Sequence, residues 1–301
     1  MSSALLRNPV PTAPVPLPSL RTLFPRCANP DCSTVRSPWH RLRRPGRGIV
    51  AERNWFCQPE CLRRTLQELL DTLCGERMPA SPPARRIPIG LILLQQGLIT
   101  AEQLQRALEL QRTHGRERLG YWLRQMGAIG EAELTRALAI QWACPVFPLE
   151  RDTGYRQCAH LVPRRLAEAS GMIPVYLSRD GSLLYTGFTS GIDYALLYAI
   201  EQMLPCRTIP CLVSETAYAR AMAVLERMVP PRETVFDSVR RTEEMTAIAV
   251  NFAERFAARS LRVQRVGAFL WLRLVAGREF RDLLFQTGPH VSAGPPLASP
   301  R

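Results

Sequence analysis

The sequence contains no lysine, and all 39 residues of the Lys and Arg class are arginine. A phosphate-binding P-loop needs a lysine ammonium group, and Schiff-base chemistry such as that of pyridoxal phosphate needs a lysine amine. Both enzyme classes are therefore excluded. Histidine is also scarce, and no Gly-x-Ser-x-Gly nucleophile elbow occurs. Because no other catalytic set emerges from the sequence, we expect a protein that is not an enzyme.

Long apolar runs are absent as well. No stretch approaches the roughly 18 apolar residues that a membrane helix needs. The proline-rich N-terminus also lacks the apolar core of a signal peptide. We therefore expect a cytoplasmic protein without membrane insertion. In a reducing compartment, the nine cysteines are better explained by metal binding or by burial than by a disulfide framework.

Four of the cysteines form two closely spaced pairs, Cys27 with Cys32 and Cys57 with Cys61. Two such pairs can supply the four thiolates of a tetrahedral structural zinc site. The second pair follows two aromatic residues and begins a predicted helix, which resembles the treble-clef-like zinc fingers. His40 is an alternative ligand, and four partly buried free thiols are an alternative interpretation. We favour zinc held by the four cysteines.

An arginine-rich segment with interleaved tryptophans lies between the two cysteine pairs. Such a segment can contact the phosphates of nucleic acid, so a zinc-finger protein that binds nucleic acid is the alternative function. A solvated basic hairpin explains the same composition. The residues concerned are Trp39, Arg41, Arg43, Arg44, Arg47, Arg53 and Trp55.

An internal repeat of thirty residues is the most specific pattern in the chain. Residues 90–111 and 120–141 are identical at ten of 22 aligned positions. Each copy reads as a short helix, a glycine stop and a longer helix, with the apolar positions at helical spacing. Gly97 and Gly127 fit the left-handed position that ends a helix. The sequence therefore predicts two copies of one helical unit, stacked against each other.

The whole pattern predicts an α+β multidomain protein with a small zinc-finger-like N-terminal unit. The prolines of the linker and of both termini indicate extended or disordered chain, and strands alternate with helices after the repeat. The predicted divisions are a disordered segment at 1–25, a zinc finger with a helix at 26–74, a linker at 75–88, the tandem helical repeat at 89–150, a small α/β sandwich at 151–229, a C-terminal helix with antiparallel strands at 232–286, and a disordered tail at 287–301.

The second copy of the repeat reads Arg118-Leu119-Gly120-x2-Leu123-x3-Gly127-x-Ile129, and the first copy is similar. This motif resembles the N-terminal domain of the type II secretion and type IV pilus assembly ATPases, known as the MshEN or secretion protein E N-terminal domain. In that family the tandem motif can bind cyclic di-GMP, with the Arg-Leu-Gly segments and the terminal glutamines lining the site. The resemblance continues, more weakly, to about residue 228.

The resemblance implies a regulatory or adaptor protein that works with secretion or pilus components and carries no ATPase domain. Cyclic di-GMP is a two-fold symmetric dianion, so it suits a duplicated element that offers guanidinium groups and glycines that allow close approach. Copy one has Pro88 where copy two has Arg118, and Arg86 is its alternative basic contact. The alternative without a ligand makes the glycines helix stops and the glutamines caps. The implied ligand-binding residues are Arg86, Ile89, Gly90, Gly97, Gln111, Arg118, Leu119, Gly120, Gly127 and Gln141.

Overall fold

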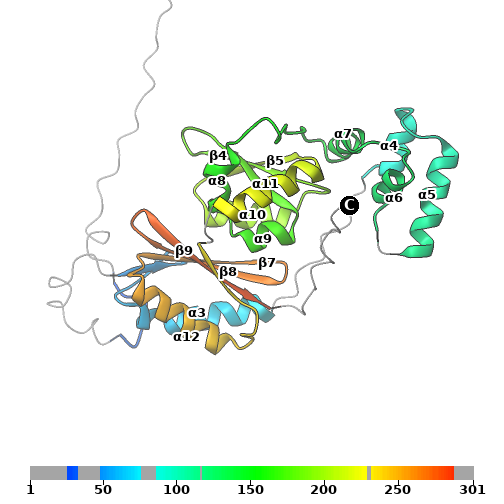
Figure 1. Cartoon of the computed structure of the whole chain (residues 1–301). Coiled ribbons are helices and arrows are strands. Elements are labelled where there is room, and N and C mark those ends of the chain that lie inside the picture. Colours follow the sequence, from blue (N-terminus) through cyan, green and yellow to red (C-terminus); the bar gives the residue numbers. More distant parts are fainter. Residues whose placement is uncertain (1–25, 33–47, 76–85, 116, 229–231, 288–301) are drawn as a thin grey trace, which may run out of the picture.

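The computed structural model describes residues 26–32, 48–75, 86–115, 117–228 and 232–287. Its architecture is α+β, and the described residues form ten α-helices, one six-stranded mixed sheet and one three-stranded sheet. Figure 1 shows the helical repeat on one side of a small α/β unit, which lies against one face of the larger sheet. Within these ranges, no helix is long and apolar enough to cross a membrane. Residues 1–25 and most of the predicted linker and tail lie outside the described residues.

The repeat forms four helices in two equivalent pairs. Gly97 and Gly127 both have φ 66, which confirms the left-handed helix ends that the sequence predicts. Leu93 and Leu123, which are equivalent by the thirty-residue shift, are fully buried in the shared core of the two copies. The helices are α4 (Ile89–Gln95), α5 (Ala101–His114), α6 (Leu119–Gln125) and α7 (Glu131–Trp142).

Two other repeated glycines allow helices to pack closely. A Cβ atom placed on Gly90 would lie 2.7 Å from the side chain of Leu104, and one placed on Gly120 would lie 2.8 Å from Leu134. Real Cβ contacts are essentially never this short, so a larger residue at either position would force the facing leucine side chain to shift, and glycine lets the short helix of each copy lie close to the long helix. Packing within each copy therefore accounts for both glycines without a ligand.

The α/β unit follows the repeat directly. Its sheet has the order β3-β4-β5, with β3 and β4 antiparallel and β4 and β5 parallel. Helix α10 lies in the connection between the two parallel strands, because parallel strands cannot be joined by a tight turn and need a longer crossover. The elements are α8 (Tyr155–Cys158), α9 (Arg164–Ala169), β3 (Met172–Leu177), β4 (Leu183–Phe188), α10 (Tyr194–Met203), β5 (Arg207–Leu212) and α11 (Glu215–Met228).

The larger sheet is built from both ends of the described chain and has the order β2-β1-β7-β8-β9-β6. Its three C-terminal hairpin strands, β7, β8 and β9, are antiparallel, as the sequence predicts. The elements are β1 (Ile49–Ala51), β2 (Asn54–Phe56), α3 (Pro59–Gly75), β6 (Glu233–Phe236), α12 (Thr242–Arg255), β7 (Ser260–Val266), β8 (Phe269–Ala276) and β9 (Glu279–Gln286).

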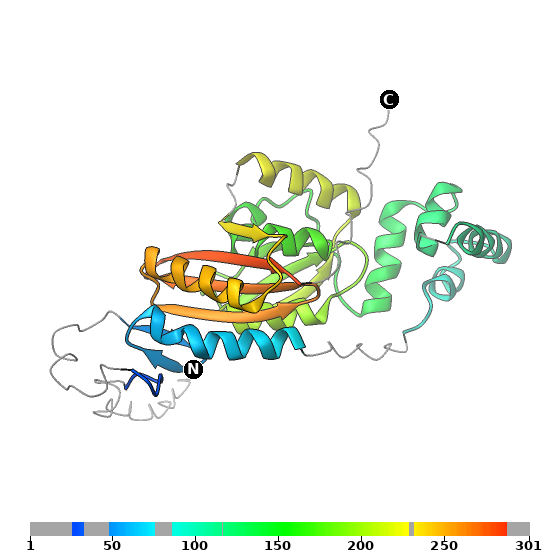
Figure 2. The same ribbon diagram turned by 90° about the horizontal axis from the view of Figure 1, so that it is seen from below.

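Strand β1 pairs in parallel with β7, and this pairing joins two segments that the sequence divides into separate units. Phe56 and Leu66 of the N-terminal segment are buried in one core with Leu272 and Phe285 of the C-terminal segment. Helices α3 and α12 lie side by side across this face of the sheet (Figure 2). Residues 48–75 and 232–287 therefore form one structural unit.

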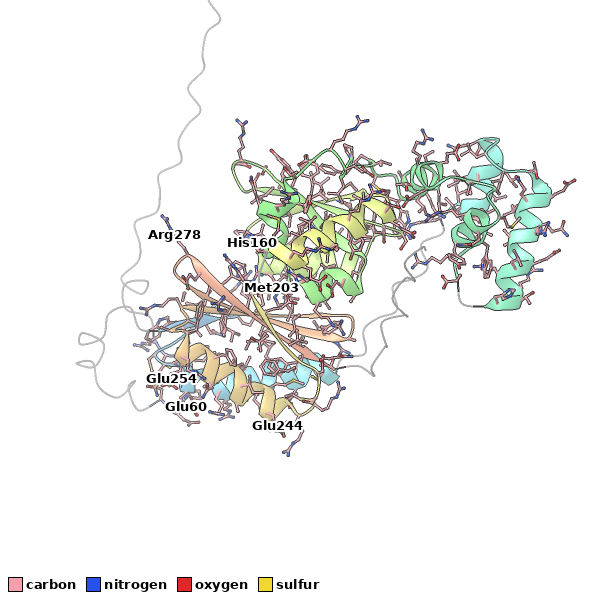
Figure 3. All side chains as sticks on the ribbon, in the orientation of Figure 1. Glu60, His160, Met203, Glu244, Glu254 and Arg278 are labelled. Carbon is pink, nitrogen blue, oxygen red and sulfur yellow. The ribbon has the colours of Figure 1, made fainter. Side chains whose placement is uncertain are left out.

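The other face of the large sheet packs against the α/β unit. Trp271 and Leu284 of the sheet share a core with Ile200 and Met203 of α10. Figure 3 labels Met203 in this contact layer, whereas Glu60 lies on the helical layer across the sheet. Because apolar side chains fill both faces, the large sheet is the central layer of the structure.

His160 lies in the same contact layer, and its ring stacks on Phe280 with a centroid separation of 6.1 Å. Burial lowers the pKa of His160 below 6.5, and the nearby Arg232 and Arg273 lower it further. The unfolded chain therefore takes up this proton at a higher pH than the folded chain does. The corresponding stability is complete above about pH 6.5 and is lost as the pH falls through the folded pKa.

We expect the His160 ring to titrate below pH 6.5 in an NMR experiment. We also expect His160→Gln to lose less stability than the wild type between about pH 7 and pH 5, as measured by urea unfolding. Partial burial raises the pKa values of Glu168 and Glu233, which makes their contribution to stability increase as the pH falls. Both residues are present in the wild type and in the variant, so their effect cancels in the comparison. An identical pH dependence in the wild type and the variant would contradict the prediction.

Candidate functional site

The four predicted zinc ligands form one cluster. The sulfur atoms of Cys27, Cys32, Cys57 and Cys61 all lie within 4.8 Å of one another. The Cys32–Cys57 and Cys57–Cys61 sulfur distances are 3.5 Å, and the Cys61–Cys32 distance is 3.7 Å. Zinc–sulfur bonds of about 2.3 Å in a tetrahedron place sulfur atoms about 3.8 Å apart. The donor set and its spacing therefore fit zinc.

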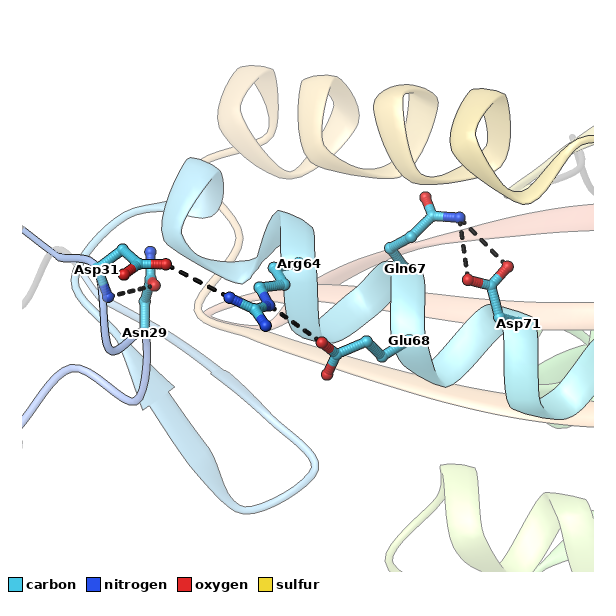
Figure 4. Close-up of polar contacts among 6 residues, drawn as sticks. All are labelled: Asn29, Asp31, Arg64, Gln67, Glu68 and Asp71. Atoms are coloured by element: carbon cyan, nitrogen blue, oxygen red, sulfur yellow. Dashed lines mark hydrogen bonds and ion pairs between the residues drawn. The ribbon is translucent and has the colours of Figure 1, made fainter.

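Local turns and one helix place these thiols. Cys32 ends a turn in which its N–H donates to the Asn29 carbonyl at 3.2 Å. Cys57 and Cys61 follow the β1–β2 hairpin, whose two-residue turn has positive φ at Glu52 and Arg53. Cys61 lies in the first turn of α3. Asp31 of the first turn pairs with Arg64 of α3 at 3.4 Å (Figure 4). The first turn is thereby connected to the helix that carries Cys61.

The electrostatics of the cluster also suit a cation. Burial raises the pKa of the Cys61 thiol, and the neighbouring Cys57 and Cys32 thiols raise it further. Four thiolates at this spacing repel one another unless a divalent metal balances their charge. His40, the alternative ligand, and the arginines of residues 33–47 lie outside the described residues.

A groove of about 800 Å³ lies between the repeat and the α/β unit. Helix α7 stands between the other repeat helices and the α/β unit (Figure 1), and α6 and α7 form one wall of the groove. Five of the implied ligand-binding residues line this wall: Ile89 from copy one and, from copy two, Arg118, Leu119, Gly120 and Gln141.

The other implied residues do not line this groove. Gly97 and Gly127 end helices, and Gly90 faces Leu104 in the repeat core. Gln111 donates a hydrogen bond to the Glu117 carbonyl at 3.1 Å. The equivalent Gln141 donates to the Ile87 carbonyl at 2.8 Å. The glutamine at the end of each copy therefore holds the backbone just before the first helix of the other copy. This exchange supports the interpretation of both glutamines as structural caps, although Gln141 also borders the groove.

Arg86 lies on the indole ring of Trp142, with its guanidinium carbon 3.3 Å from the ring centroid. It is therefore engaged in a cation–π contact rather than lining the groove. Trp142 itself lines the groove, and Gly191 lies against its ring. The sequence gives no sign of this contact between the last residue of α7 and the loop after β4.

Two polar contacts hold the walls of the groove together. Arg124 of α6 forms an ion pair with Glu215 of α11 at 2.7 Å. Glu131 of α7 accepts hydrogen bonds from the Thr216 N–H at 2.8 Å and its hydroxyl at 2.7 Å. Burial opposes ionisation of Glu131, but the Thr216 hydrogen bonds and Arg124 lower its pKa overall. With Arg124, Glu131 and Glu215 engaged, Arg118 is the exposed guanidinium among the described residues that line the groove, and the exposed carboxylate of Glu117 lies next to it in sequence.

The second wall was not predicted. It comes from Ala169, Ser170 and Glu215 and from the loop 189–193, which precedes α10. The Thr-Ser-Gly run indicates a loop before a helix, but nothing in the sequence places that loop opposite the repeat. Only the fold brings these residues to the groove.

The described residues thus form a two-copy helical repeat with a groove of about 800 Å³ against the α/β unit, and sequence comparison shows which proteins the chain resembles. The type IV pilus assembly ATPase PilB of Thermus thermophilus is 27% identical over 135 residues, which are 45% of this chain and 15% of the ATPase. PilB of Myxococcus xanthus is 34% identical over 115 residues, or 38% of this chain and 19% of the ATPase. Part of the chain is thus homologous to the N-terminal domains of these ATPases, and the chain spans less than a fifth of the length of these curated relatives.

Two solved structures are similar over about half of the chain. MshE, solved with cyclic di-GMP, is 26% identical with a TM-score of 0.40, and the match covers 46% of this chain and 99% of that one. The N-terminal domain of XpsE is 17% identical with a TM-score of 0.28, and the match covers 50% and 97%. No protein-family model matches the sequence.

Proposed function

We propose that this chain is a non-catalytic regulatory or adaptor protein of a secretion or type IV pilus system, and that its groove binds cyclic di-GMP. The observation that carries the proposal is the convergence of Arg118, Gly120 and Gln141 with Ile89 of the first copy on one groove. Its volume of about 800 Å³ lies in the range of small-molecule sites. Homology to pilus ATPase N-terminal domains supports the assignment to such a system.

The chemistry of the groove suits one end of a cyclic dinucleotide better than a symmetric grip on both ends. Arg118 is exposed at the start of α6, where its planar guanidinium can donate two hydrogen bonds to a phosphate or to a guanine edge. The equivalent position in copy one is Pro88, which offers neither a charge nor an N–H. The apolar side chains of Ile89 and Leu119 supply surface beside Arg118.

Calorimetry with cyclic di-GMP tests this function. We expect the wild type to bind. We expect Arg118→Ala to lose at least about tenfold in affinity, since a charge-assisted hydrogen-bonding partner is removed. Arg106→Ala is the matched control, because Arg106 is an exposed arginine of the same repeat on α5, which does not line the groove. A folded wild type that gives no binding heat at any temperature tested would refute the proposal.

The four-cysteine cluster has a separate role in this proposal. It would hold one structural zinc ion, with all four positions filled by Cys27, Cys32, Cys57 and Cys61. A closed site of this kind leaves no position for a substrate or a water molecule, so zinc would supply stability rather than chemistry. Its position at the edge of the large sheet supports a structural role.

A further inference from the structure

Two adjacent side chains of the groove, those of Glu117 and Arg118, are available to a ligand. Both residues line the groove and both are exposed. Neither side chain forms a hydrogen bond or an ion pair with another residue in the described part of the chain. The backbone at this point is held in place, because Gln111 donates to the Glu117 carbonyl at 3.1 Å.

The other charged side chains of the groove have partners within the protein. Asp193 caps α10 by accepting a backbone hydrogen bond at 3.0 Å. Contacts between the two walls engage Glu131, Glu215 and Arg124. The described lining therefore leaves one carboxylate beside one guanidinium group for a ligand.

The charge of this lining favours a base over a phosphate. Among the described residues that line the groove, four carboxylates stand against two guanidinium groups. An excess of negative charge repels a phosphate that enters the groove. A purine base is uncharged and carries hydrogen-bond donors and acceptors side by side. The end of the groove at Arg118 is therefore better suited to a base of the ligand than to its phosphodiester groups.

Guanine is the base that matches a carboxylate next to a guanidinium group. Its O6 and N7 atoms accept hydrogen bonds, which suits the paired donors of arginine, and its N2 amino group donates, which suits a carboxylate. Adenine carries an amino donor where guanine has O6, so Arg118 would face another donor. Adenine also lacks the N2 amino group from which Glu117 would accept.

We propose that Glu117 and Arg118 together bind one guanine of the cyclic dinucleotide, and that Glu117 selects guanine over adenine. This inference rests on the proposed function and states which part of the ligand meets Arg118. The equivalent positions of copy one are Ile87 and Pro88, which carry no charged group. The protein therefore has one such pair, and the site selects the identity of one base only.

Three cyclic dinucleotides test this selectivity by calorimetry with the full chain. We expect cyclic di-GMP and the mixed cyclic GMP–AMP to differ in affinity by only about twofold, because each carries a guanine and the symmetric ligand has two equivalent orientations. Cyclic di-AMP should bind at least about tenfold more weakly than either, because it leaves both side chains without partners. A mixed ligand that binds as weakly as cyclic di-AMP, or equal affinity for all three ligands, would overturn the inference.

Glu117→Ala distinguishes binding of a base from binding of a phosphate, because the two arrangements predict effects of opposite sign. If Glu117 accepts from guanine, the variant loses at least about tenfold in affinity for cyclic di-GMP, and its preference over cyclic di-AMP falls by a similar factor. If a phosphate lies here instead, removal of the carboxylate strengthens binding. Unchanged or stronger binding would refute the inference.

Glu109→Ala is the matched control. Glu109 is an exposed glutamate of the same repeat on α5 and does not line the groove, so this variant should bind as the wild type does. The outcomes also separate the two proposals. If the wild type binds cyclic di-GMP but does not distinguish it from cyclic di-AMP, the role of Glu117 fails and the proposed function stands. If the folded wild type does not bind cyclic di-GMP, both proposals fail.

Discussion

Cys57→Ser is expected to destabilise the unit built on the six-stranded sheet severely, because it removes one of the four ligands of the proposed zinc site. Structural zinc binding is worth about 10–16 kcal/mol in small zinc-dependent domains, whereas whole domains are stable by only about 5–15 kcal/mol. Losing one of four ligands therefore removes a large share of the stability. We expect the melting temperature to fall by about 10 °C or more. Cys57 is the best ligand to replace, because it is half-buried and its loss leaves a smaller packing defect than that of Cys32 or Cys61.

The measurement combines metal analysis with thermal unfolding. Purified wild type should contain about one zinc ion per chain, as four thiolates bind one tetrahedral ion. A strong chelator should lower its melting temperature in the same way as the substitution does. Cys206→Ser is the matched control, because Cys206 is a half-buried thiol in the α/β unit and lies outside the cluster. Protein without stoichiometric zinc, or a Cys57→Ser variant with wild-type stability, would contradict the prediction.

Loss of the proposed zinc ion is expected to affect more than the four-cysteine cluster, because the cluster shares its core with the large sheet. Cys32 and Cys61 are buried in the same core as Leu272 of β8 and Met245 of α12. Strand β1 also contributes an edge pairing to β7. The strands β7 to β9 and helix α12 are therefore expected to lose amide protection together with the segment around the cysteine cluster when the proposed zinc ion is removed.

Local sequence signals predicted many of the elements. Hydrophobic periodicity and flanking turn residues in the sequence mark the strand Met172–Leu177 and the helix Glu215–Met228 directly. The glycine helix ends at 97 and 127 were also predictable, because positive φ favours glycine. Strands β1, β2 and β6 were not predicted, since three or four residues are too few for a pattern to emerge.

Contacts between segments far apart in the sequence could not be predicted, either for the fold or for the candidate site. Nothing in the sequence of β1 indicates that it pairs with β7, some 210 residues further along the chain. The groove shows the same limit. Its repeat wall could be predicted because Arg118 and Gln141 belong to a recognisable motif, whereas Ser170 and Gly191 reach it only through the packing of two units. Cysteine spacing was more informative, because metal geometry itself restricts where the ligands can lie.

A buried ion pair between β8 and β9 gives the second large effect. Arg273 donates to both carboxylate oxygens of Asp282 at 2.7 Å, and their side chains are 3% and 2% exposed. Trp271 donates to the same carboxylate at 2.8 Å, and Arg273 also donates to the Leu161 carbonyl of the α/β unit at 2.7 Å. The pair therefore connects the large sheet to its neighbour.

Asp282→Asn keeps the shape of the side chain and removes its charge, which leaves the Arg273 guanidinium buried without a counterion. We expect a loss of about 3–5 kcal/mol in the free energy of unfolding, measured with urea. The exposed pair of Glu60 and Arg63 is the matched control, and Glu60→Gln should cost less than about 1 kcal/mol. Equal costs for the two variants would contradict the prediction.

The double variant Arg273→Met with Asp282→Leu separates the cost of an unpaired charge from the contribution of the pair itself. Replacing a buried ion pair by apolar residues of similar volume is often neutral or stabilising. Here the double variant also leaves the Trp271 N–H and the Leu161 carbonyl without their partners. We therefore expect its stability to lie between those of Asp282→Asn and the wild type. A double variant less stable than Asp282→Asn would mean that the hydrogen bonds to Trp271 and Leu161, rather than the balance of charge, make this pair necessary.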